Sequence, residues 1–138
     1  MNIAEWVALG SLGLLSVVDL KARKIPLLPV IILGMLAVVY RLWVGTSLFD
    51  MAAGVLPGCI LLLLAMLTRE SIGYGDGAVL VVLGLFCGVK QTVAAFGMAL
   101  VLAALLAMIL LVLKRVGRKT ELPFLPCLCS GYVLCLLW

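Results

Sequence analysis

Two aspartates, Asp19 and Asp76, lie in surroundings that suit acid and base chemistry. Asp76 lies in the stretch SIGYGDGAVL among three alternating glycines, Gly73, Gly75 and Gly77. Glycines remove side-chain bulk and let the backbone turn or approach a partner closely. Asp19 closes the first apolar stretch, in LLSVVDLKARKIP. Two carboxyl groups within a few ångströms share a proton, so one activates water while the other hydrogen-bonds a carbonyl oxygen. We therefore expect a paired-carboxylate site able to hydrolyse a peptide bond without a metal or a covalent intermediate.

Each aspartate also has a purely structural interpretation. Asp19 could form an ion pair with Lys21 or Arg23 at a helix end. Asp76 could cap a helix start, where the helix dipole and free N–H groups favour a charged carboxylate. Within a catalytic pair, the roles of base and acid belong to the coupled pair, and the sequence does not assign them.

The elements that carry these residues are those of a membrane protein. Of the 138 residues, 67% are hydrophobic and 12% are charged, which is far more apolar than the roughly half expected of a soluble domain. Apolar stretches occupy 3–18, 25–44, 51–68, 77–89, 92–113 and 122–138. Only helices satisfy the backbone of such stretches in lipid, so the sequence predicts an all-α integral membrane protein with one domain over 1–138. Glu5 stands where a signal peptide has basic residues, so we expect the first stretch to remain as a span.

The basic residues predict the orientation of the chain. They gather in two clusters, after the first and the fifth apolar stretch: Lys21, Arg23 and Lys24, then Lys114, Arg115, Arg118 and Lys119. The positive-inside rule places both clusters in the cytoplasm, which requires an even number of crossings between them. We therefore expect six transmembrane helices with both termini on the outer side. The fourth stretch rises only about 20 Å, so it should begin below the membrane surface after an inward-dipping glycine-rich turn.

Neither nucleic acid nor metal is an expected partner. The net charge of +4 comes from residues in short loops, where it reports orientation. The five cysteines include no C-x-x-C pair and the chain has no histidine, so we expect apolar filler, no metal site and no cofactor.

Three blocks in order resemble the type IV prepilin peptidases, the bacterial branch of the GxGD intramembrane aspartyl proteases. DLKARKIP is similar to the end of the first helix of that family, ESIGYGDGAVLVVLGLFCG to its GxGD region, and ELPFLPCLCSGY to the start of its last helix. The chain resembles a short form without the cytoplasmic zinc-binding insert. Because longer members that carry this insert also N-methylate the trimmed pilin, we expect no methyltransferase activity.

The resemblance implies a function and a place in the cell. Asp19 and Asp76 would be the catalytic aspartates, and Gly73, Gly75 and Gly77 the supporting loop. The substrate would be a prepilin or pseudopilin, cut at the cytoplasmic face after the glycine that ends its basic leader. The protein would lie in the bacterial inner membrane and serve a type IV pilus or a secretion system.

Four other residues bear on substrate contacts. Glu70 and Glu121 could receive the positive charge of the leader, or could be solvated loop acids that pair with neighbouring basic residues. Leu27 stands where many members have asparagine, and Ala78 where many have lysine, so contacts there are expected to differ.

Two functions from other classes explain parts of the pattern. SIGYGD is close to the filter of a potassium channel, but it follows a long apolar run and is predicted to face the cytoplasm. A small proton-coupled transporter would use intramembrane acids as a relay, yet every acid here lies at a predicted helix end. The channel function also leaves Asp19 and the last block, ELPFLPCLCSGY, unexplained.

Overall fold

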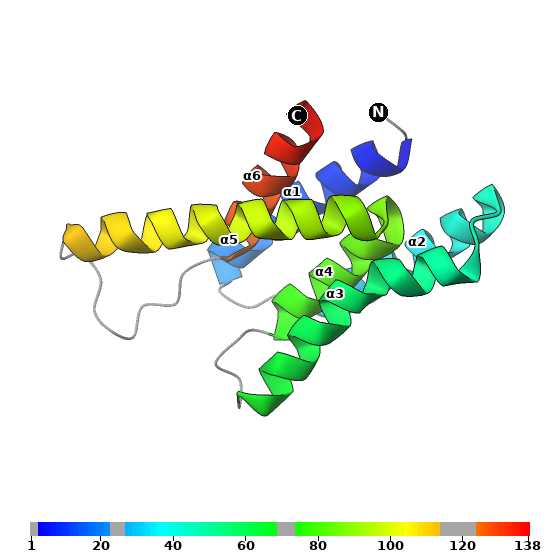
Figure 1. Cartoon of the computed structure of the whole chain (residues 1–138), viewed down its shortest axis with the longest axis horizontal. Coiled ribbons are helices and arrows are strands. Elements are labelled where there is room, and N and C mark those ends of the chain that lie inside the picture. The colour runs from blue at the N-terminus through cyan, green and yellow to red at the C-terminus, as the bar shows by residue number, and fades with distance from the viewer. Residues whose placement is uncertain (1–2, 23–26, 69–73, 114–123) are drawn as a thin grey trace.

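The chain folds into helices throughout the part that the structure describes. The structure is a computed structural model, and it describes residues 3–22, 27–68, 74–113 and 124–138. Within these ranges the elements are α1 (Ile3–Ala22), α2 (Leu27–Val44), α3 (Leu48–Leu67), α4 (Tyr74–Cys87), α5 (Val89–Val112) and α6 (Phe124–Leu137) (Figure 1). The described residues contain no strand, and the predicted all-α fold is confirmed.

The helix ends differ from the expected stretches for identifiable reasons. α1 continues past Asp19 to Ala22, because a charged residue ends an apolar run without ending a helix. α5 likewise includes Lys90, and only Gly88 separates it from α4. Gly88 has a φ of 84°, a left-handed conformation that glycine adopts without strain and that breaks the helix there. α4 begins at Tyr74, three residues before the expected start.

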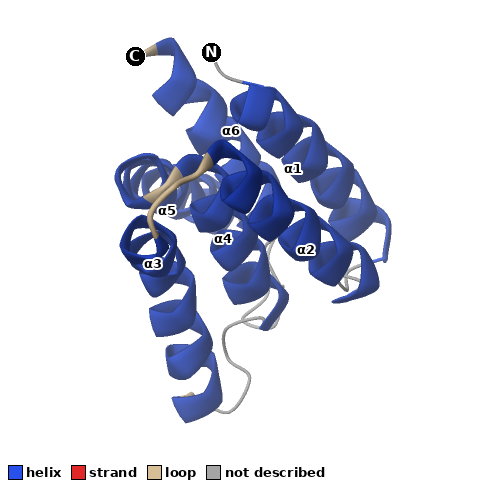
Figure 2. Ribbon diagram, turned by 90° about the vertical axis from the view of Figure 1, so that its right-hand side faces the viewer, coloured by secondary structure: helices blue, strands red, loops and turns tan. Residues whose placement is uncertain are grey.

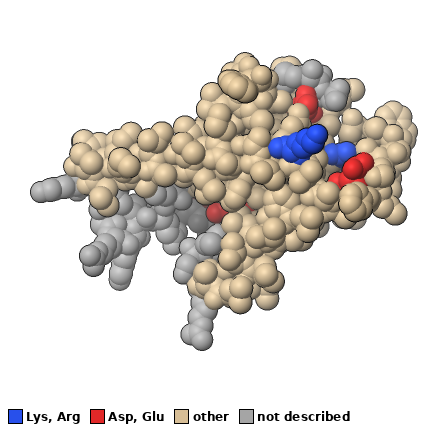
Figure 3. Space-filling view, viewed as in Figure 1, with Lys and Arg blue, Asp and Glu red and all other residues tan. Residues whose placement is uncertain are grey.

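Four described helices, α1, α2, α3 and α5, are long and apolar enough to cross a membrane. α4 and α6 are apolar but have 14 residues each. Large apolar side chains on the long helices face outward, among them Leu14, Met35, Leu63 and Leu111. On the face that Figure 3 shows, the described residues form a largely uncharged surface with few blue or red side chains. These features define a multi-pass helical membrane protein.

The short helix α4 lies at the centre of the bundle. It packs against α1, α2, α3 and α5, while α6 packs against α1 and α5 (Figure 2). Eight of its residues between Gly77 and Phe86 are buried. A helix that is apolar on every side is stable when other helices surround it, and α4 occupies that position.

Glycines let α3 and α4 pack backbone to backbone. A Cβ atom at Gly54 would collide with the carbonyl oxygen of Gly84, and one at Gly84 with the carbonyl oxygen of Gly54. Further along, Gly58 of α3 lies against Val81. Small residues at such crossings allow the close approach on which helix association in lipid depends. The two helices therefore run antiparallel in close contact, which fixes the position of α4.

Candidate active site

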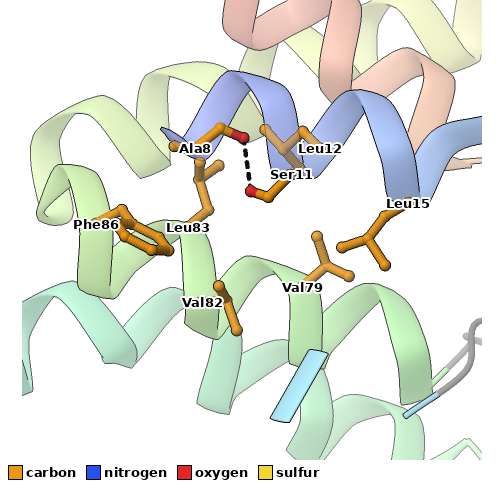
Figure 4. A pocket seen from close by; sticks show the side chains of 8 residues that line it. All are labelled: Ala8, Ser11, Leu12, Leu15, Val79, Val82, Leu83 and Phe86. Carbon is orange, nitrogen blue, oxygen red and sulfur yellow. Dashed lines mark hydrogen bonds between the residues drawn. The ribbon is translucent and has the colours of Figure 1, made fainter. Parts of the chain in front are cut away.

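α1 and α4 pack antiparallel around a small apolar cavity. Four residues of each helix line it: Ala8, Ser11, Leu12 and Leu15 of α1, and Val79, Val82, Leu83 and Phe86 of α4. Figure 4 shows Leu15 and Val79 at one end of this interface, with Ala8, Leu83 and Phe86 at the other. The C-terminal part of α1 therefore faces the N-terminal part of α4.

Asp19 and Asp76 continue the two packing faces of this interface. On α1, Asp19 follows Ala8, Leu12 and Leu15 at spacings of four, three and four residues. On α4, Asp76 precedes Val79, Leu83 and Phe86 at spacings of three, four and three. Residues three and four apart lie on one face of a helix, so both aspartates extend the contact toward the same end.

The two carboxyl groups lie close enough to interact electrostatically, and the charge of Asp19 acts on Asp76. Both side chains are partly buried. Among the described residues, neither carboxyl group forms a hydrogen bond or an ion pair, including with Lys21. The structure thus brings together the two predicted aspartates as interacting carboxyl groups at one end of the α1–α4 interface.

The glycines around Asp76 are divided by the helix start. Gly75 and Gly77 lie within the first turns of α4, and Gly77 is buried against Leu62 of α3. The expected glycine-rich turn is therefore partly helical. Gly73 lies outside the described residues, as do Glu70 and Glu121.

The helical start of α4 bears on the channel interpretation. Tyr74, Gly75 and Asp76 have helical backbone. A potassium filter needs consecutive carbonyl oxygens directed at the ion path, whereas helical carbonyls point along the helix axis. This part of the chain is therefore unsuited to coordinate ions through its backbone.

The polar contacts at the opposite end of the bundle did not follow from the sequence. Arg41 of α2 donates from Nε to the carbonyl oxygen of Leu85 at 2.6 Å. Gln91 of α5 donates from Nε2 to Glu5 of α1 at 2.9 Å. Glu5 and Arg41 are isolated charges in apolar helices, and this was the one sign in the sequence that they form such contacts. Their partners are far away in sequence. These contacts tie α1 and α2 to the α4–α5 junction.

The cysteines are free, and one of them is hydrogen-bonded. Cys87 Sγ and the hydroxyl of the fully buried Tyr132 lie 2.9 Å apart, which links α4 to α6. No cluster of three or more potential metal-binding side chains occurs among the described residues.

Fold and site together define a multi-pass helical membrane protein with two apposed aspartates at one end of its central helix. The chain belongs to the type IV leader peptidase family, whose sequence model matches residues 6–113. It is also similar to a protein of Bacillus subtilis (strain 168) named prepilin leader peptidase/N-methyltransferase, with 32% identity over 92 residues. The match covers 67% of this chain and 36% of that relative, so the chain spans about a third of the relative's length. No solved structure matches the chain significantly.

Proposed function

We propose that this chain is a type IV prepilin peptidase, a membrane-embedded aspartic endopeptidase with Asp19 and Asp76 as its catalytic pair. The observation that carries the proposal is that the packing faces of α1 and α4 end in two carboxyl groups that interact electrostatically. Two such groups at close range share one proton more readily than they both ionise.

Such a pair can hydrolyse a peptide bond directly. The ionised carboxylate takes a proton from water as the water oxygen attacks the scissile carbonyl carbon. The protonated carboxyl group hydrogen-bonds the carbonyl oxygen and stabilises the charge that develops there. A proton then passes to the leaving amine as the C–N bond breaks. Which aspartate is the base depends on the coupled pair.

The proposed substrate is a prepilin or pseudopilin with a basic leader, a glycine at the cleavage site and a hydrophobic helix after it. Membership of the leader peptidase family supports this substrate class, as does the name of the Bacillus subtilis relative. Glu70 and Glu121 remain candidates for contacts with the basic leader. The peptide would reach the aspartates at the cytoplasmic face.

The proposed topology is a single domain of six membrane-crossing helices in the bacterial inner membrane, with both termini outside. The distribution of basic residues supports it, because both basic clusters then lie in the cytoplasm. α4 and α6 rise only about 21 Å each as 14-residue helices, so their ends would lie below the membrane surface.

The proposal covers the peptidase activity alone. The name of the Bacillus subtilis relative includes an N-methyltransferase activity, but the sequence of this chain contains none of the paired C-x-x-C motifs of the zinc-binding insert that the methylating members carry. We expect the trimmed pilin to leave this enzyme with an unmethylated N-terminus, which mass spectrometry of the product would establish.

Co-expression with a pilin-like substrate tests the function. Wild type should convert the substrate to the shorter band, and Asp19→Asn and Asp76→Asn should each abolish conversion. Asp50→Asn is the matched control. Like Asp76, Asp50 lies in the first turn of its helix, α3, but its side chain is exposed. Full cleavage by either of the first two variants would contradict the two-aspartate mechanism.

A further inference from the structure

A large apolar groove lies between α1 and α2 and is open to the outer surface of the bundle. Its volume is about 480 Å³, and from α1 it is lined by Val7, Gly10, Ser11, Leu14, Leu15 and Val18. From α2 it is lined by Pro29, Ile32 and Leu33. α1 and α2 are consecutive in sequence, yet each packs along α4 and not along the other. No described helix of the chain fills the space between them.

The spacing of the lining residues is that of a helix-packing face. The six residues of α1 follow one another at intervals of three, one, three, one and three, and those of α2 at intervals of three and one. Such intervals form a continuous stripe along a helix, the pattern used for packing against another helix. Two stripes that face a common space form a site for a third helix.

The groove suits an apolar partner. Leu14 is 72% exposed, and Val7 and Val18 are also exposed. Ser11 supplies a hydroxyl group, but this group already donates to the carbonyl oxygen of Ala8 at 2.8 Å. Gly10 is exposed, and a Cβ atom there would have no atom within 4 Å, so a partner backbone can approach closely at this point.

The groove ends beside the paired aspartates. Val18, its last residue on α1, directly precedes Asp19. Leu15 lines both this groove and the cavity between α1 and α4, so the groove and that cavity share a wall. From Val18 the α1 stripe extends back to Val7, about 16 Å into the apolar layer.

We propose that this groove holds the hydrophobic helix of the substrate, the segment that follows the scissile bond. The inference rests on the proposed function. A peptide cut beside Asp19 must continue from the cleavage site into the membrane, and the groove supplies a helix-packing surface that begins there. Contact along α1 and α2 then positions the scissile carbonyl at the carboxyl pair, with Leu14 and Gly10 as docking residues.

Crosslinking tests the occupant. A photoreactive amino acid replaces Leu14 in the Asp76→Asn protein, which should bind the substrate without cleaving it. The matched control carries the same amino acid at Leu111, which is 74% exposed on α5. We expect a substrate adduct from position 14 and none from position 111. Adducts from position 14 to lipid alone, or to a second copy of the chain, would overturn the proposal.

Filling the groove tests its importance for cleavage. Gly10→Leu should lower the rate of prepilin cleavage about tenfold, because the added side chain occupies the site of the partner helix. Gly97→Leu is the matched control, since Gly97 is also an exposed mid-helix glycine with nothing within 4 Å of an added Cβ. Equal amounts of both proteins in the membrane would show that folding is unaffected. If wild type cleaves and both variants cleave equally, only the docking site is wrong; if wild type does not cleave, the proposed function itself fails.

Discussion

Gly77 of α4 lies directly against Leu62 of α3, one residue after Asp76. A Cβ atom on Gly77 would lie 2.8 Å from two carbons of the Leu62 side chain. The residues of α4 that meet α3 are Gly77, Val81 and Gly84, and those that meet α1 are Val79, Val82, Leu83 and Phe86. At about 100° per residue these two sets lie on opposite faces of the helix. The turn that carries Asp76 is therefore held between α1 and α3.

Gly77→Ala should disturb that turn. The new methyl group would lie too close to the Leu62 side chain, so that side chain or the start of α4 must shift. Catalysis is sensitive to displacements of about 1 Å, and we expect the rate of prepilin cleavage to fall about tenfold or more. The measurement is the cleavage rate at equal amounts of membrane protein.

A compensating change provides the control for this contact. Leu62→Ala removes the colliding atoms and should restore most of the cleavage rate in the Gly77→Ala protein. Gly13→Ala, where an added Cβ meets nothing within 4 Å, should leave the rate unchanged. An unaltered rate in the Gly77→Ala single variant would show that this contact does not position Asp76.

Asp19 and Asp76 should behave as one unit in a double-mutant cycle. If they share a proton in catalysis, either Asp→Asn change removes the function of both, and the second change has nothing further to remove. We expect the double variant to cleave no more slowly than either single variant, as measured with sensitive detection of the product. Losses that multiply in the double variant would mean that the two carboxyl groups act independently.

The backbone contact between α3 and α4 should dominate stability. A Cβ atom on Gly84 would overlap the Gly54 carbonyl, and backbone cannot move aside as a flexible side chain can. We expect Gly84→Ala to lower the free energy of unfolding by about 2 kcal/mol or more. Thermal unfolding in detergent would measure it. Gly97→Ala, at an open position, should leave the unfolding temperature unchanged or raise it, and equal losses in both variants would contradict the role of the contact.

The salient features of the site followed from the sequence because they depend on local pattern and charge. The apolar stretches predicted six helices, and the glycines around Asp76 indicated space beside a carboxyl group. The positive-inside rule put Asp19 and Asp76 on one side of the membrane, and the structure brings their helix ends together. The roles of the two residues in catalysis stay predictions.

The packing partners did not follow from the sequence. In a helix such as α4, which is apolar all round, periodicity does not indicate which face meets which neighbour. The pairing of Gly54 with Gly84, and the separation of α1 from α2, depend on how whole helices cross. The end of α1 at Ala22 and the start of α5 at Val89 also differ from the predicted stretches, because a charged residue ends an apolar run without ending a helix.

Arg41 should stabilise the end of the bundle opposite the aspartates. Its Nε group donates to the carbonyl oxygen of Leu85, one of the last four of α4 that have no partner within the helix. Arg41→Met keeps the apolar stem and removes this bond, which should lower the free energy of unfolding by about 2 kcal/mol with little effect on cleavage. Thermal unfolding and cleavage assays would check both parts. Lys90→Met, which changes an exposed charge nearby, is the control, and an equal loss there would point to charge alone.

Reporter fusions test the six crossings, because the number of spans decides on which side each loop lies. With both termini outside, alkaline phosphatase should be active when fused after Trp138 and after Thr46, between α2 and α3. Fluorescent protein should be bright when fused after Thr68, because the end of α3 then lies in the cytoplasm. The short helix α4 is the decisive element: if it did not cross, the two basic clusters would face opposite sides, against the positive-inside rule. Active phosphatase after Thr68 would contradict both the proposed topology and the cytoplasmic position of Asp76. Inactive phosphatase after Trp138 would contradict the proposed number of crossings.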